Sequence, residues 1–115
     1  MSRNQTAILT LTVPASAVLI ADRFVTPLGA QAAADANALG VTRMAAAIGD
    51  KVVVDVLGTA IVESGAAIAA GATIKVDATG RAITWVTSGA RVGVALEAAT
   101  AVGQFIEVLL IPNAA

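Results

Sequence analysis

The chain has 115 residues, with seven Lys or Arg, eight Asp or Glu, and a formal net charge of −1. It contains no His, Cys or Tyr, which excludes disulfide scaffolds, His-ligated haem, His-dependent nucleophiles and zinc centres of the usual kind. Seven scattered basic residues cannot form the positive face that nucleic-acid binding requires. Charged residues make up 13% of the chain, about half the ~25% of an ordinary domain, so the surface is suited to lying against another protein.

The length allows one domain and no second one. Residues 7–111 hold all the patterned segments and are expected to form a single β domain. Residues 1–6 are polar and are expected to be an N-terminal arm, and residues 112–115 a short C-terminal tail.

The first patterned segment superficially resembles a secretory signal peptide, because Arg3 precedes the apolar stretch 7–17. However, residues 8–13 alternate apolar side chains with two threonines and run into Pro14, which is typical of a strand and not of a leucine-rich signal helix. No stretch approaches the ~18 continuous apolar residues of a membrane helix. We therefore predict a strand here and no membrane span.

The same alternation continues along the chain and predicts a series of short strands. The expected strands are residues 7–13, 18–20, 23–26, 38–42, 51–57, 59–63, 73–76, 81–86, 91–96 and 105–111. Gly58 is expected to be the hinge between two of them, and Gly80 to close a tight turn. Alanine-rich stretches between the strands are too short for stable helices. They are expected to be small-residue connections, with residues 30–37 forming a loop or one short helix.

Short strands joined by glycine-bearing turns indicate an all-β fold. The expected architecture is a compact single-domain β-barrel or β-sandwich of short antiparallel strands. Its connections are rich in Ala and Gly, with at most one or two short helical turns. The excess of Val, Ile and Thr fits this class, since β-branched side chains pack well on a pleated surface.

Two stretches, residues 40–56 and 93–110, resemble each other when Gly49 is aligned with Gly103 and one insertion is allowed. This alignment predicts that both stretches bury the same side of a strand that follows a small-residue turn. A duplication is therefore a hypothesis. The aligned apolar positions are Val52 with Ile106, Val54 with Val108, and Val56 with Leu110.

Few residues are candidates for chemistry. Asp55 and Glu107 fall on the polar side of their strands, and paired carboxylates can cleave glycosides, but the chain lacks aromatic platforms and donors around them. Both are expected to be solvated, outward-facing acids. Lys51 and Lys75 could display a carrier's prosthetic group, yet their positions favour ordinary edge and outward charges. No phosphate-binding loop is present. We predict no enzyme, no metal, no cofactor and no small-molecule substrate.

Two features could contact a partner. Trp85 shares its side of a strand with Ile83, which favours core packing, while the alternative is an oligomer or partner contact, where Trp is enriched. The terminal residues could be frayed or could order on a neighbouring subunit. The candidate contacts are Arg3, Asn4, Gln5, Thr6 and Trp85.

The order of segments resembles the small capsid cement, or head decoration, proteins of tailed bacteriophages. The resemblance covers residues 7–111 and begins with ILTLTVPAS and DRFVTPLG. It continues through NALGVTRMAAAIGDKVVVDVLGTAIVESGAAIAAG and ATIKVDATGRAIT, and closes with GARVGVALEAATAVGQFIEVLLI.

The resemblance implies a structural virion protein, usually a homotrimer, made in the bacterial host cytoplasm and bound to the outer face of the mature head at capsomer junctions. Its partner would be the major capsid protein, and its role would be to stabilise the expanded capsid. The family has no catalytic residues. Alternatives are another small β module of a phage particle, such as a tail or head-completion component, and a carrier or ligand-binding β-barrel.

Overall fold

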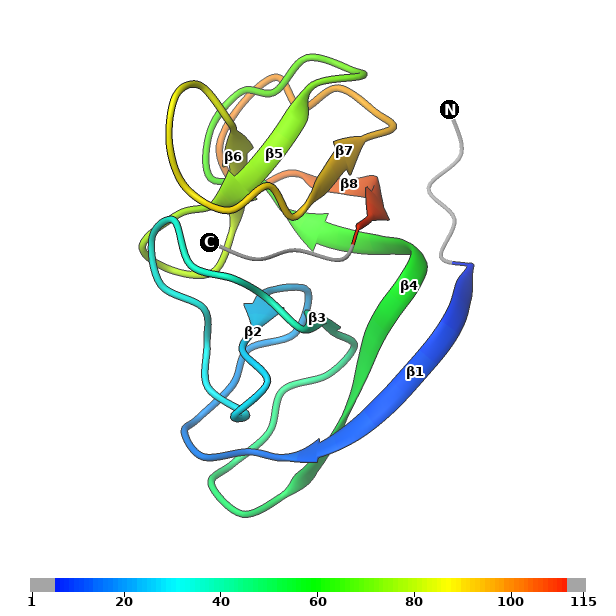
Figure 1. Ribbon diagram of the computed structural model, residues 1–115, viewed down its shortest axis with the longest axis vertical. Coiled ribbons are helices and arrows are strands. Elements are labelled where there is room, and N and C mark those ends of the chain that lie inside the picture. The colour runs from blue at the N-terminus through cyan, green and yellow to red at the C-terminus, as the bar shows by residue number, and fades with distance from the viewer. Residues whose placement is uncertain (1–5, 112–115) are drawn as a thin grey trace.

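A computed structural model describes residues 6–111. They form one antiparallel sheet of eight strands in the order β2-β3-β4-β8-β7-β5-β6, with β1 paired to β4, and the sheet curls into a nearly closed barrel (Figure 1). The strands are β1 (Ala7–Pro14), β2 (Phe24–Val25), β3 (Gly40–Thr42), β4 (Lys51–Glu63), β5 (Thr73–Val76), β6 (Ala82–Thr84), β7 (Gly93–Ala95) and β8 (Phe105–Leu110). The predicted all-β class is confirmed, with the barrel and not the sandwich as its form, and the described residues contain no helix.

Strand β4 is longer than predicted, because the expected break at Gly58 does not occur. Gly58 has a φ of +101° within a continuous strand, and a Cβ at this position would collide with the carbonyl oxygen of Thr6. The residue lets β4 pass from one set of partners to another. Its first half pairs with β1 and β3, and its second half pairs with β8.

This change of partners divides the barrel into two halves with the same plan, which confirms the predicted alignment of residues 40–56 with 93–110. In the first half, β4 lies between β1 and β3; in the second half, β8 lies between β4 and β7. Three pairs of facing residues in the first half have counterparts in the second half. Val13↔Val52 corresponds to Val62↔Ile106, Val41↔Asp55 to Val94↔Leu109, and Val25↔Gly40 to Ile74↔Gly93.

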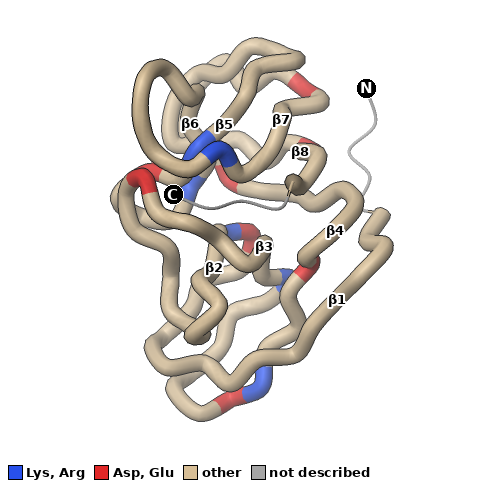
Figure 2. Tube along the Cα trace, in the orientation of Figure 1, with Lys and Arg blue, Asp and Glu red and all other residues tan. Residues whose placement is uncertain are grey.

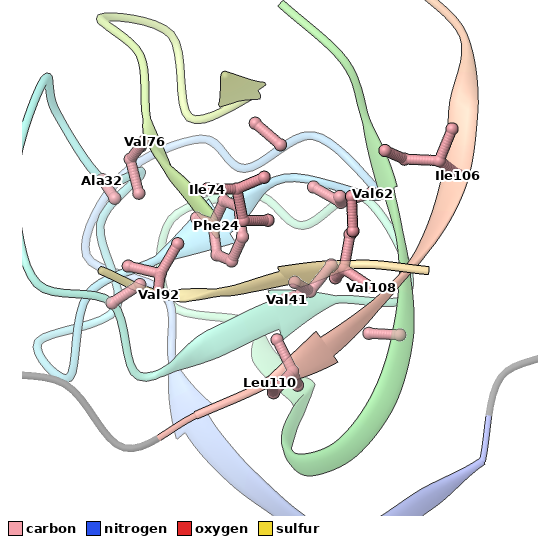
Figure 3. Packing of buried hydrophobic residues seen from close by; sticks show 14 of the residues in the cluster. Phe24, Ala32, Val41, Val62, Ile74, Val76, Val92, Ile106, Val108 and Leu110 are labelled. Carbon is pink, nitrogen blue, oxygen red and sulfur yellow. The ribbon is translucent and has the colours of Figure 1, made fainter. Parts of the chain in front are cut away.

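The core lies in two clusters, one large and one small. Phe24 and Ile74 are fully buried in the large cluster, to which β2 to β8 all contribute (Figure 3). The small cluster fills the first half beneath β1 and includes Leu19, Val52 and Val54. The predicted inward side of β4 and β8 is therefore confirmed at Val52, Val54, Ile106, Val108 and Leu110, while Val56 is half-buried.

Candidate interaction surface

Strand β1 is an edge strand whose residues 8–12 are all exposed to solvent, while Val13 packs against the small core cluster. Within the described residues β4 is its only strand partner. Ile8 is 81% exposed, and Leu9 and Leu11 are about half as exposed. Natural edge strands are usually protected against further pairing by charges, prolines or bulges. Here the register shifts near Leu9 and Pro14 ends the strand, but no charge lies between Thr6 and Ala21. An irregular register and a proline thus protect part of this edge, while its uncharged apolar side chains stay exposed.

At the end of β1, residues 15–20 fold against residues 44–50, and we call these two segments tip 1. Leu19 and Ala46 form a single β-bridge with both side chains buried. Because side chains alternate along extended chains, the residues on either side of this bridge point outward. Val18, Ile20, Ala45 and Ala47 flank the bridge and are exposed, and the alternation explains this. Met44 and Ile48, one position further out, are exposed as well, although alternation alone would turn them inward. We call these six residues the apolar face of tip 1.

Many of the charged residues lie where the two halves meet, and one acidic and one basic residue, Asp50 and Lys51, lie at the tip 1 turn (Figure 2). Arg23 from the first half contacts Glu63 of the second at 3.2 Å, and Lys75 contacts Asp35 at 2.8 Å. Arg81 adds a contact of 3.5 Å to Glu63. Much of the small charge content is thus used within the molecule, which leaves β1 and most of tip 1 uncharged.

The two candidate carboxylates do not face solvent as predicted. Asp55 is 1% exposed, because its strand lies between β1 and β3, and its Oδ1 accepts a hydrogen bond of 2.7 Å from Arg43 Nε. Glu107 is 8% exposed, because the segment after β7 folds along β8 and Glu97 accepts a hydrogen bond from its backbone nitrogen. The two residues lie in different halves of the barrel and do not form a carboxylate pair that could act on one substrate.

Of the candidate N-terminal contacts, Arg3, Asn4 and Gln5 lie outside the described residues. Thr6 is exposed, but its backbone is tied to β4. Its nitrogen donates to the hydroxyl of Thr59 at 2.8 Å, and its carbonyl accepts from the nitrogen of Thr59 at 2.9 Å. Thr6 is therefore anchored to the sheet.

Trp85 belongs to neither core cluster, so the interpretation as a core residue is wrong. It follows the last residue of β6 and is half-buried, and its backbone nitrogen still donates to the carbonyl of Thr73 in β5 at 2.8 Å. Its Nε1 donates to the carbonyl of Gly89 at 2.9 Å, and the guanidinium of Arg91 lies 4.1 Å from the ring centroid. The ring closes the 85–91 turn beneath an exposed arginine.

The described residues offer little else that could bind a ligand. They contain no cluster of metal-ligating side chains and no helix that could cross a membrane. An open hollow of about 410 Å³ lies between the halves, with mostly apolar walls that include Leu39, Val56 and Ile111. Asn37 adds one buried oxygen without a hydrogen-bond partner. No ionisable side chain lines this hollow, so its walls supply no acid, base or nucleophile.

Comparison with known proteins places the chain in a family. A model of the phage cement protein family matches residues 2–110. Among solved structures, the chain is similar to the N base of the head fiber of bacteriophage phi29, with a TM-score of 0.71 and 20% identity over 90% of this chain and 93% of that chain. At that identity the likeness shows a shared fold. No curated protein matches the sequence. Because the family model spans almost the entire chain, the protein belongs to the phage cement protein family.

Proposed function

We propose that the protein is a structural component of a tailed-phage virion that binds the outer surface of the head at capsomer junctions and stabilises the expanded capsid. The family match over residues 2–110 carries this proposal. The similarity of the fold to the base of a phage head fiber supports the proposal, because that fiber is itself a component of a phage head.

The surface chemistry agrees with a binding role. A protein that holds a shell together needs exposed area that gains free energy when it is covered, and β1 with tip 1 offers uncharged apolar side chains for this purpose. The chain has no His, so it carries no side chain whose ordinary pKa lies between pH 5 and 8. Attachment to the shell should therefore change little across that range.

We propose the major capsid protein as the partner and a homotrimer as the bound form. A trimer that touches several capsid subunits converts later contacts into intramolecular ones, and avidity can then rise by roughly 10²–10⁴. Weak single contacts are sufficient in such an arrangement. The additional proposed contacts are Arg3, Asn4, Gln5, Thr6 and the half-buried Trp85.

The proposal can be tested with purified protein and expanded phage heads that lack it. Bound protein should co-sediment with the heads in a saturable number of copies and should raise the temperature at which the heads rupture. Protein that stays in the supernatant would contradict the proposal. A few copies confined to one vertex would indicate a head-completion component instead. Intact mass reporting a biotinyl or lipoyl group on Lys51 or Lys75 would indicate a carrier.

A further inference from the structure

The repeat gives the barrel two tips built on the same backbone plan. Tip 1 was defined above, and tip 2 comprises residues 64–69 and 98–104. The bridge Leu19↔Ala46 in tip 1 corresponds to Ile68↔Ala99 in tip 2. The turns match too, because Gly49 donates to the carbonyl of Ala15 at 2.8 Å and Gly103 to that of Ser64 at 2.9 Å. The tips lie at opposite ends of the molecule's long axis (Figure 1).

The side chains on the two tips differ although the backbones correspond. In tip 1, Val18 and Ile20 are 68% and 48% exposed, and their counterparts in tip 2 are Ala67 and Ala69. Met44 is 54% exposed, whereas its counterpart Glu97 is half-buried and bonded to the backbone of β8. Only Ile48 has an apolar counterpart of comparable size and exposure, Val102.

Tip 2 thus acts as an internal control for tip 1. It forms the same bridge and turn with alanines in place of Val18 and Ile20 and Glu97 in place of Met44, so these three large apolar side chains of tip 1 are not required to build the bridge and turn. Exposed apolar clusters that folding does not require are characteristic of binding surfaces. The segments that carry the apolar face of tip 1 directly follow β1 and directly precede its partner β4, and β1 is also uncharged and has exposed apolar side chains.

We propose that tip 1 is the end of the molecule that docks on the phage shell, with tip 2 pointing away from it. This inference rests on the proposed function and adds the surface through which it acts. Docking would cover Val18, Ile20, Met44 and Ile48 together with the neighbouring edge of β1.

The size and charge of the face determine its occupant. A stable interface between two free proteins takes roughly 20–30 residues from each side, whereas the outer face of tip 1 has six. That face is too small to hold a soluble dimer of this chain, but it is sufficient when a shell repeats the contact. The six residues of the face carry no ionisable group, and covering an unpaired charge costs several kcal/mol, so the part of the shell that meets them should be apolar. Exposed Arg43, Asp50 and Lys51 border the face, so the surrounding contact can be polar.

Paired substitutions at equivalent positions test the inference. Ile48→Asp places a charge on tip 1, and Val102→Asp places the same charge at the matching position of tip 2. Both side chains are exposed, so both variants should keep the fold, as measured by circular dichroism and thermal melting. In co-sedimentation with expanded heads, Ile48→Asp should weaken binding by about tenfold or more, while Val102→Asp should bind like the wild type. Val18→Lys and Ala67→Lys form a second matched pair with the same expected contrast.

The outcomes separate the two proposals. If the wild type does not bind heads at all, the proposed function fails and the docking face fails with it. If the wild type binds and the tip 1 and tip 2 variants bind equally well, the function stands and the docking face is wrong. Sedimentation velocity adds a third outcome: if Ile48→Asp or Val18→Lys dissociates the free protein into smaller species, tip 1 is an interface between copies, and the inference is overturned.

Discussion

Arg23 and Glu63 face each other across the junction between the two halves of the barrel, with Nη2 and Oε1 3.2 Å apart and both side chains less than one-fifth exposed. Arg23 Nη1 also donates to the carbonyl of Thr79 at 2.9 Å. One guanidinium from the first half therefore holds two groups of the second half.

We expect Arg23→Met to lower the free energy of unfolding by about 1–3 kcal/mol, since it removes charge-assisted bonds from partly buried groups and keeps the apolar stem of the side chain. Denaturant titration measures the change. Lys51→Met is the control, because Lys51 is exposed and its loss should change stability by no more than about 0.5 kcal/mol. Equal effects of the two substitutions would show that the bonds of Arg23 across the junction do not stabilise the folded protein.

Asp22 lies beside this junction, and its pKa is raised by burial, with a further contribution from the negative charge of Glu63. The folded state therefore binds a proton on Asp22 more tightly than the unfolded state does. Relative to an unperturbed carboxyl, Asp22 costs no folding free energy below its unfolded pKa of about 3.8, where it is protonated in both states. The protein loses stability as the pH rises from there through the higher pKa of the folded state, because the folded state must then hold a buried charge. Asp22→Asn removes this cost, and Asn tolerates the φ of +61° at this position.

The Asp22→Asn variant should accordingly melt at a higher temperature than the wild type at pH 7, and the difference should shrink as the pH falls below 4. Thermal melts at several pH values check the trend. A variant that is less stable than the wild type at pH 7 would show that the carboxylate makes a favourable contact that outweighs its burial.

Gly58 permits both the bend of β4 and its close approach to Thr6. Gly58→Ala should destabilise the protein for two reasons, the positive φ and the collision of the new Cβ with the backbone. Gly49→Ala separates these reasons, because Gly49 has a φ of +90° but a Cβ added there would meet no atom within 4 Å. We expect about 1 kcal/mol of destabilisation for Gly49→Ala and about 2–4 kcal/mol for Gly58→Ala. Similar losses for both would mean that β1 moves aside freely.

Trp85 is half-buried, so its truncation should cost less than the ~3–5 kcal/mol of a fully buried aromatic ring. We expect Trp85→Ala to lower stability by about 1–2 kcal/mol, and Trp85→Phe to recover part of this by keeping a ring beneath Arg91. Chemical denaturation of the three proteins provides the comparison. A loss from Trp85→Ala as large as that of a core residue would contradict the half-buried position.

The sequence predicted the features that depend on local alternation and on turns. The side of β4 and β8 that faces the core followed from the spacing of Val52, Val54, Ile106 and Val108, and the repeat followed from aligning Gly49 with Gly103. These predictions succeeded because a strand's period of two assigns side chains to faces without reference to the rest of the fold.

The same period could not predict what covers the other face. Asp55 was expected in solvent, yet it is buried and paired with Arg43, which directly follows the neighbouring strand β3, and alternation within one strand does not reveal such a partner. Trp85 was predicted to pack in the core because the alternation was extended one residue beyond the end of β6, and this prediction is wrong. The exposed face of tip 1 was also not predictable, since the partner of residues 18–20 is a segment more than twenty residues away.

Cryo-electron microscopy of expanded phage heads saturated with the purified protein tests the central claim most directly. We predict density for this barrel on the outer surface of the head at the junctions between capsomers, in many symmetry-related copies and with tip 1 against the shell. Heads that show no such density at saturating protein would contradict the claim that this chain is a shell-binding structural protein.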